Sequence, residues 1–280
     1  NTRRGARRNI SAHYDLGNDF FALWLDETMM YSSAMFEHPD QSLADAQRHR
    51  LDVVCQKLGL GPDDHVIEIG SGWGGFAIHA AKNYGCRVTS TTISREQYEL
   101  AWQRIDQAGL HDRIELLFED YRDLEGMYDK LVSIEMIEAV GSDQYDTYFD
   151  QCNRLLKPGG RMLIQAITIA DDQYAYSQKN VDFIQRYIFP GGCLPSLAVM
   201  SSTIVKVSDM VVTSVEDIGQ DYALTLNHWR HNFFTHIQQV IEMGYPEEFT
   251  RMWEFYLCYC EGGFIEEAIS DVHLVAEKPA

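Results

Sequence analysis

The residues best suited to hold a ligand form a glycine-rich run, Val66–Gly75, which begins as an apolar strand. Four glycines close the run within six residues, namely Gly70, Gly72, Gly74 and Gly75. Glycine lets the backbone turn sharply and lets a ligand approach the main chain. Because glycines weaken the start of a helix, a tight turn without a ligand is the less favoured interpretation.

Two ligand classes compete for this run. Gly70, Gly72 and Gly75 fit the G-x-G-x-x-G dinucleotide fingerprint, which requires an acid about 20 residues further on to hold a ribose hydroxyl. The next strand instead ends in Thr89–Thr92, and the acid, Glu68, precedes the glycines. This order, acid-x-Gly-x-Gly-x-Gly, resembles the first motif of S-adenosylmethionine methyltransferases, and it disfavours a nicotinamide oxidoreductase.

A second polar segment, Thr92–Gln97, opens a predicted helix. Ser94 and Gln97 are spaced as a capping box, which is a purely structural role. A ribose contact from the same hydroxyl and amide is the alternative, and the sequence leaves both open.

Two acids follow a further buried strand at helical spacing, Glu135 and Glu138. Solvated acids at a helix start are favoured by the helix dipole, and this bland role fits Glu135. Full exposure is less expected for Glu138, because Ala139–Gly141 follows it. Tyr222 precedes a helix, and as a core tyrosine its hydroxyl would still need a partner.

Alternating strand and helix patterns position these residues between 45 and 167, which predicts a parallel sheet with crossover helices. The predicted strands are His65–Ile69, Arg87–Thr91, Arg113–Phe118, Lys130–Ile134 and Gly160–Ile167. The predicted helices are Leu43–Leu58, Gly74–Asn83, Ser94–Ala108 and Gln144–Leu156. Later elements are helices near Ser196–Val207, Tyr222–Met243 and Glu247–Ala268 and strands near Met210–Val215 and Val272–Glu277.

These elements predict an α/β fold with a mostly parallel, doubly wound, Rossmann-like sheet of the class I methyltransferase type. We expect a single domain over residues 1–280, with a helical N-terminal approach (1–58), a core (59–167), and a helical cap with final strands (168–280).

The amino-acid composition limits the kinds of partner that this chain can bind. The formal net charge of −19 argues against nucleic acid. No apolar run is long enough to span a membrane, and the first residue is Asn1, so we expect a piece of a longer protein. The six cysteines lack metal-ligand spacing and predict buried free thiols in a reducing compartment, and no metal site is expected.

The chain begins with a cluster of four arginines, Arg3, Arg4, Arg7 and Arg8. Such a cluster can dock on anionic lipid headgroups at roughly 1 kcal/mol per cation. A solvated tail is the alternative interpretation.

Several segments together resemble one family, the cyclopropane fatty acid synthases and mycolic acid cyclopropane synthases, and particularly its long bacterial and plant-type branch. The segments are His13–Phe21, Met30–Ala34, Val66–Gly75, Thr92–Gln97, Glu135–Gly141 and Tyr187–Gly192. They span nearly the whole chain in order, and we expect the family's small N-terminal domain to be absent from it. The resemblance implies that a cis alkene in an acyl chain attacks the methyl group of S-adenosylmethionine, after which proton loss closes a cyclopropane ring.

The resemblance also implies a bicarbonate ion that takes the proton. Its family ligands correspond to Glu138, Ile167 and Tyr222, whereas a cysteine position holds Ser33 and a histidine position holds Gln165. Glutamine still donates through its amide but cannot carry a proton, and the plant-like enzymes resemble this chain there. We therefore expect Glu138 beside the bicarbonate site with Tyr222 and Gln165.

For S-adenosylmethionine the resemblance implies contacts at three places. Tyr31, Ser32, Gly70 and Gly72 are expected near the methionine part, Thr92, Ser94 and Gln97 near the ribose, and Asp120 and Tyr121 near the adenine. Glu68 and Gly74 of the glycine run are also expected to bind the cofactor.

The departures at Ser33 and Gln165 keep a second product open, a methyl- or methylene-branched acyl chain. A cofactor-binding protein without catalysis is a third hypothesis, opposed by the retained Glu138 and Tyr222.

The resemblance implies a cytoplasmic protein that meets unsaturated lipid at the inner membrane surface. Its oligomeric state stays open, with a homodimer as one hypothesis. Aromatic residues near the C-terminus are expected as core or as a lipid tunnel: Trp229, Phe233, Phe234, Trp253, Phe255, Tyr256 and Tyr259.

Overall fold

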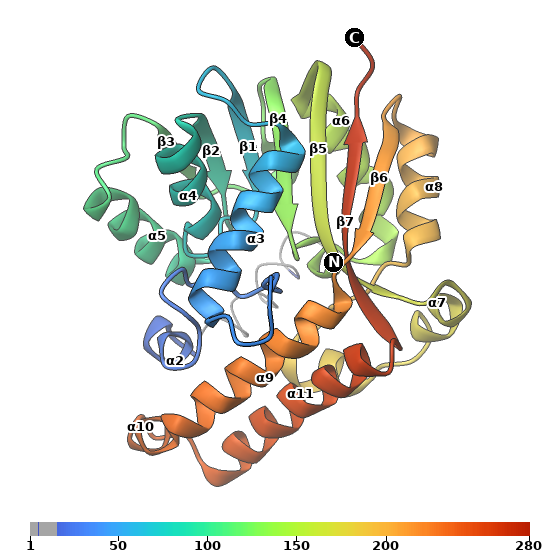
Figure 1. Ribbon diagram of the computed structural model, residues 1–280. Helices are drawn as coiled ribbons and strands as arrows, with labels where there is room; N and C mark the ends of the chain where they lie inside the picture. The colour runs from blue at the N-terminus through green and yellow to red at the C-terminus, as the bar shows by residue number, and fades with distance from the viewer. Residues whose placement is uncertain (1–4, 6–15) are drawn as a thin grey trace.

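The computed structural model describes Gly5 and residues 16–280, and its centre is a seven-stranded sheet with the order β3-β2-β1-β4-β5-β7-β6 (Figure 1). The strands are β1 (His65–Ile69), β2 (Arg87–Thr91), β3 (Ile114–Leu117), β4 (Tyr128–Ile134), β5 (Leu156–Ile169), β6 (Val211–Asp217) and β7 (Ile269–Glu277). The first five strands are parallel, and β7 runs antiparallel to both of its neighbours. The predicted α/β class with a mostly parallel sheet is confirmed.

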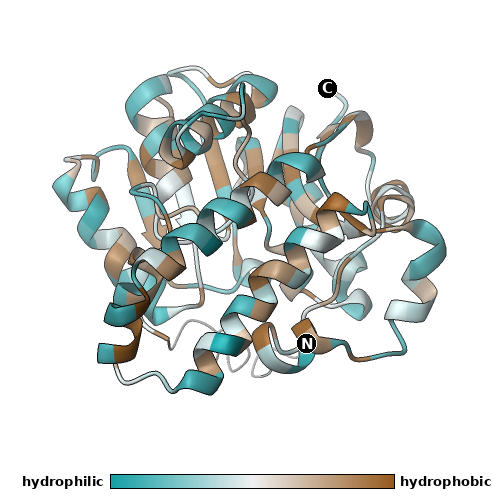
Figure 2. Ribbon diagram, turned by 60° about the horizontal axis from the view of Figure 1, so that its bottom comes forward, coloured by the Kyte–Doolittle hydropathy of each residue, from teal (hydrophilic) through white to brown (hydrophobic). Residues whose placement is uncertain are grey.

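Helices cover both faces of this sheet. They are α3 (Leu43–Leu58), α4 (Gly75–Tyr84), α5 (Arg95–Gln107), α6 (Tyr145–Leu155) and α8 (Leu197–Val207). Leu163 of β5 packs with the α3–α4 side, whereas the next residue, Ile164, packs with the α6–α8 side. This alternation gives two apolar layers, and Figure 2 shows the strands between them as mainly hydrophobic. The sheet is therefore doubly wound, as expected.

A third apolar cluster caps the edge of the sheet where β4 ends. It is built by α2 (Asn18–Ala22), α9 (Gly219–Thr235), α10 (Ile237–Glu242) and α11 (Glu247–Ile265). Figure 1 shows α9 and α11 side by side across the lower ends of the strands. The short elements between the strands are α7 (Asp171–Ser177), a π-helix (Ile184–Ile188), and the 3₁₀ turns Tyr121–Asp123, Ile137–Ala139 and Ser142–Gln144.

Most predicted elements agree with the structure, but the long helix expected over Tyr222–Met243 is wrong. The helix α9 starts at Gly219 and ends at Thr235, and α10 follows after His236. His236 leaves the helical conformation at φ −106° and ψ 16°, and its Nδ1 lies 2.9 Å from the carbonyl oxygen of Asn232. Side chains that bond a preceding carbonyl often bend a helix in this way.

The expected helical approach over residues 1–58 is only partly helical, because no helix lies between α2 and α3. The four arginines and the first three residues of His13–Phe21 lie outside the described residues. No described helix is both long and apolar enough to cross a bilayer.

All six cysteines are free thiols, as expected. Cys55, Cys86 and Cys152 are buried, and Cys193 and Cys260 are partly exposed. The expected burial is wrong for Cys258, which is exposed on α11.

We predict that Phe76→Ala on α4 lowers the free energy of unfolding by about 3–5 kcal/mol, since Phe76 is fully buried against the sheet. Urea denaturation measures the change. The matched control is Trp102→Ala on α5, which is 48% exposed and should change stability by less than about 0.5 kcal/mol. Equal losses for both variants would contradict this assignment of the core.

Candidate active site

The glycine loop joins β1 to α4 at the carboxyl edge of the sheet. Gly70, Gly72 and Gly74 have φ values of 99°, 48° and 84°, which side chains rarely adopt. A Cβ atom on Gly72 would meet no described atom within 4 Å, whereas one on Gly75 would collide with the Met30 sulfur. The loop is therefore packed behind Gly75 and open in front of Gly72, which fits the approach of a ligand to the backbone.

Glu68 lies buried in β1 directly before this loop. Its Oε2 accepts a hydrogen bond of 2.5 Å from Ser90 Oγ, its register partner on β2. Burial raises the pKa of Glu68 to about 8. The main chain of β2 also holds the loop, since Thr91 O accepts from the N–H groups of Gly70 (3.1 Å) and Ser71 (2.8 Å).

The segment Thr92–Gln97 lies beside the loop, and its polar groups bond one another. Ser94 Oγ caps α5 by accepting from Gln97 N at 3.3 Å. The second half of the predicted capping box is wrong, because Gln97 Oε1 accepts from Thr92 Oγ1 at 2.9 Å. The Ser94 N–H donates instead to Thr92 Oγ1 at 3.1 Å. The ribose role of these three buried residues stays a prediction.

Tyr31 and Ser32 reach the same edge from the segment before α3. The Tyr31 hydroxyl lies 2.8 Å from that of Tyr256, so it joins this segment to α11. The buried Ser32 Oγ accepts from Arg50 Nη2 at 2.8 Å.

Asp120 and Tyr121 follow β3. Both Asp120 oxygens accept from Arg122, at 2.8 Å from Nε and 2.7 Å from Nη2. Tyr121 packs edge-on against Tyr148. The Asp120 carboxylate is thus engaged with Arg122, and the expected adenine contact stays a prediction.

The centre of the site is Glu135, which the sequence suggested was only a helix-start acid. That interpretation is wrong. Tyr222 Oη donates to Glu135 Oε2 at 2.6 Å, while Gln165 Nε2 and Ser33 N each donate to Oε1 at 2.8 Å. Burial raises the pKa of Glu135 although these hydrogen bonds oppose the shift. The structure therefore unites Ser33, Gln165 and Tyr222, but around Glu135.

Glu138 lies in the 3₁₀ turn after Glu135, and its Oε1 accepts from Ile167 N at 2.6 Å. Glu138 bonds Ile167, whereas Tyr222 and Gln165 bond Glu135, and the expected place of Glu138 beside a bicarbonate site with these two residues stays a prediction. Its other oxygen, Oε2, is buried without a hydrogen-bond partner among the described residues. Burial, with the nearby Glu135 charge as a further cause, raises the pKa of Glu138 to about 8.

Ser33 contributes its main chain rather than its side chain to this centre. Its hydroxyl donates to Ala34 O at 2.9 Å, and its N–H reaches Glu135. A serine in place of a cysteine therefore leaves the backbone donor unchanged.

Sequence reasoning missed Asp271 and His273, which lie on β7 opposite β5. Gln165 Nε2 also donates to Asp271 Oδ2 at 2.9 Å, and His273 Nε2 lies 3.1 Å from Gln165 Oε1. Lys57 Nζ lies 2.7 Å from His273 Nδ1, and burial lowers the pKa of His273 well below its ordinary value. A neutral His273 accepts from Lys57 and donates to Gln165 Oε1, so it turns the Gln165 amide nitrogen toward the carboxyls.

Arg50 is fully buried near this group of acids. Its Nη2 bonds Ser32 and Gln47, each at 2.8 Å. Burial lowers its pKa, while the charges of Glu135 and Asp271 oppose that shift. Burial and the neighbouring Glu135 charge raise the pKa of Asp271 well above its ordinary value, which favours its protonated form. A spacing of Asp and His two apart on one strand was the signal available in the sequence.

The C-terminal aromatics divide into two sets. Trp229, Phe233, Trp253 and Tyr256 are buried in the cap, as core residues are. The remaining three are exposed on the helices, namely Phe234, Phe255 and Tyr259.

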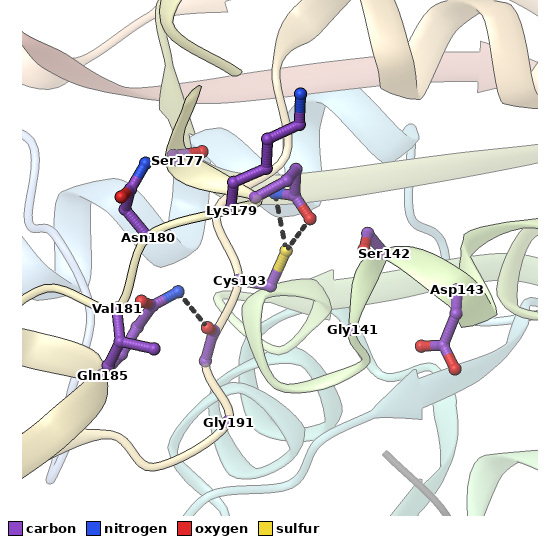
Figure 3. Close-up of a pocket in the computed structure, with 12 residues that line it drawn as sticks. Gly141, Ser142, Asp143, Ser177, Lys179, Asn180, Val181, Gln185, Gly191 and Cys193 are labelled. Atoms are coloured by element: carbon purple, nitrogen blue, oxygen red, sulfur yellow. Dashed lines mark hydrogen bonds between the residues drawn. The ribbon is translucent and has the colours of Figure 1, made fainter. Parts of the chain in front are cut away.

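A separate cavity of about 480 Å³ lies between the Gly141–Asp143 turn and the segment from Ser177 to Cys193 (Figure 3). Gln185 Nε2 closes part of its wall by donating to Gly192 O at 2.9 Å. No predicted site residue lines it. Within the described part of the chain, no cluster of three or more His, Cys, Asp or Glu side chains could hold a metal.

Several curated proteins with similar sequences have names that describe lipid-modifying enzymes. The chain is 43% identical over 270 residues to tuberculostearic acid methyltransferase of Mycobacterium tuberculosis, and 37% over 273 residues to a probable fatty acid methyltransferase of Pseudomonas putida. It is 40% identical over 253 residues to cyclopropane-fatty-acyl-phospholipid synthase of Escherichia coli. These matches cover 94%, 96% and 90% of the chain but only 63%, 69% and 63% of the relatives.

A similar solved structure is mycolic acid cyclopropane synthase CmaA1 complexed with SAH and CTAB, with a TM-score of 0.90 and 31% identity. The similarity covers 97% of this chain and 98% of that one. The family model for mycolic acid cyclopropane synthetase matches residues 1–274. The chain therefore belongs to the mycolic acid cyclopropane synthetase family.

Proposed function

We propose that the chain transfers one carbon from S-adenosylmethionine to the cis double bond of an unsaturated fatty acyl chain. The observation that carries the proposal is the meeting of the glycine loop and a group of buried carboxyls at one edge of the sheet. Relatives named as synthases and methyltransferases of fatty acyl chains support it.

In this proposal the glycine loop binds the cofactor, and Glu138 stabilises the charge that develops during the reaction. When bound, S-adenosylmethionine supplies an electrophilic methyl group. The loop receives the cofactor on its open face at Gly72, and the structure fits it because a side chain at Gly72 would fill that space. Glu138 keeps a buried carboxylate oxygen without a described partner, which stabilises positive charge as it develops on the acyl chain. The aromatic cap excludes water from the cation.

Two products are compatible with this chemistry. Ring closure agrees with the 40% identical cyclopropane synthase, whereas the 43% and 37% identical methyltransferases favour a methyl- or methylene-branched chain as a second candidate. Incubation with cofactor and cis-unsaturated phospholipid vesicles, followed by proton NMR, distinguishes them: cyclopropane protons resonate far upfield of alkene protons. Absence of both products with every cis-unsaturated lipid and acyl carrier would refute the proposed function.

We predict that Gly72→Val weakens binding of S-adenosylhomocysteine at least tenfold, because the branched side chain occupies the open face of the loop. Isothermal titration calorimetry measures the affinity. Gly109→Val is the matched control, since Gly109 also has a positive φ, of 66°, and open space around it, but lies after α5. Equal weakening in both variants would assign the effect to backbone strain.

We predict that Glu138→Gln lowers turnover by about 10²–10³ at saturating cofactor, because it removes the charge and keeps the shape. The control Asp146→Asn changes an exposed acid of α6 and should have little effect. Turnover within a few-fold of the parent would contradict the role of Glu138.

The pKa of about 8 for Glu138 predicts a specific dependence of turnover on pH. Glu138 gains its charge as the pH rises through this value, so kcat/KM of the parent should rise there and that of Glu138→Gln should not. The cationic cofactor favours the charged carboxylate, so the kcat profile should shift to lower pH.

We further propose a cytoplasmic protein that contacts the membrane surface peripherally. An exposed aromatic group supports this: Tyr187, Phe255 and Tyr259 are each about half exposed, and Phe183 packs against Phe255 at 4.7 Å between ring centroids. Aromatic rings suit the bilayer interface, and the arginines at positions 3, 4, 7 and 8 would add attraction to anionic headgroups.

Replacing Phe255 and Tyr259 with Ser should weaken binding to anionic phospholipid vesicles at least tenfold, because apolar surface is lost from the interface. Vesicle sedimentation measures binding. Trp102→Ser, on the exposed side of α5, should leave it unchanged. Unaltered binding of the double variant would refute this docking face.

A further inference from the structure

The donors expected to hold a bicarbonate ion are already used by protein carboxylates. Ser33 N, Gln165 Nε2 and Tyr222 Oη all donate to Glu135 at 2.6–2.8 Å, and Ile167 N donates to Glu138 at 2.6 Å. A bicarbonate ion bound by the same donors would have to displace the Glu135 carboxylate. These residues therefore do not fit bicarbonate in the presence of Glu135.

We propose that the Glu135 carboxylate takes the place of the bicarbonate ion and is the built-in proton acceptor of the reaction. The inference rests on the proposed one-carbon transfer and names its base. A carboxylate and a bicarbonate ion present the same planar pair of oxygens, so one set of donors can orient either.

The proton balance is the same as with an external base. In ring closure a C–H bond of the transferred methyl group breaks, and its electron pair forms the last C–C bond of the ring. In branch formation the electron pair of a C–H bond beside the cation forms a C=C bond. The proton passes in both cases to a Glu135 oxygen and leaves to water once the product has gone.

The backbone directs Glu135 into this position. Its φ of 48° lies in the left-handed region, and its N–H donates to Gln165 O at 2.8 Å. A non-glycine residue in this conformation is held there by its surroundings, and such strain concentrates at functional sites. Asp271 accepts from the same Gln165 amide that donates to Glu135. Glu135 accepts three hydrogen bonds, which favour its charged form, whereas burial and the Glu135 charge favour the protonated form of Asp271.

The decisive variant is Glu135→Gly, because glycine tolerates the positive φ and leaves a space lined by the three donors. In buffer stripped of bicarbonate its turnover should fall by about 10²–10⁴, the usual worth of a positioned general base. Added bicarbonate should restore much of this loss. Glu135→Gln fills the space and should stay inactive, and Glu138→Gln should not be rescued.

The parent should be indifferent to bicarbonate. A parent rate that falls when bicarbonate is removed would overturn the proposal, as would full activity of Glu135→Gly without it. Equal rescue of Glu135→Gln would also overturn it, because the effect would then not depend on a vacated site.

A binding measurement separates this inference from the proposed function, since it needs no turnover. Calorimetric titration with bicarbonate should show one site in Glu135→Gly, weakened by a second change, Tyr222→Phe, and no such site in the parent. Binding to the parent that Tyr222→Phe abolishes would refute the replacement. Thermal melting with and without bicarbonate gives a second readout, in which only Glu135→Gly should be stabilised.

Discussion

The structure of the site depends on the burial of one carboxylate, that of Glu135. An ionised carboxylate is costly to remove from water unless donors replace the lost hydration. Here the donors come from three distant parts of the chain: Ser33 before α3, Gln165 on β5 and Tyr222 on α9. The carboxylate is satisfied only when the N-terminal segment, the sheet and the cap are all in place, so the closure of the cap and the formation of the site are one event.

Buried acids outnumber buried bases at this edge. Glu135, Glu138 and Asp271 lie near the buried Arg50, and the pKa of each acid is raised, so the resting site holds protons rather than a full set of charges. A cation placed beside these acids lowers their pKa values and favours their ionised forms. A sulfonium cofactor and a carbocation are both cations, so the arrangement suits the proposed ligand and the proposed reaction together.

The aromatic cap sets the dielectric surroundings of these charges. Trp24 and Trp229 are fully buried, and neither indole N–H has a hydrogen-bond partner within the described ranges. Their rings meet edge-on at 5.5 Å. Trp229 also packs edge-on against Tyr222 at 5.9 Å, and Tyr222 bonds Glu135. An apolar environment strengthens electrostatic interactions and raises the pKa of carboxyl groups such as Glu135.

The sequence by itself determined the strands β1 and β2, the glycine loop and the Ser94 cap, because hydrophobic periodicity, positive φ and capping are local properties. Only the tertiary structure decided which acid occupies the centre. Glu135 and Glu138 are three residues apart and look alike in sequence, but the left-handed φ of Glu135 aims its side chain at β5 and α9. Asp271 joins the site through the pairing of β5 with β7, across 106 residues from Gln165, and no local pattern encodes a contact at that separation.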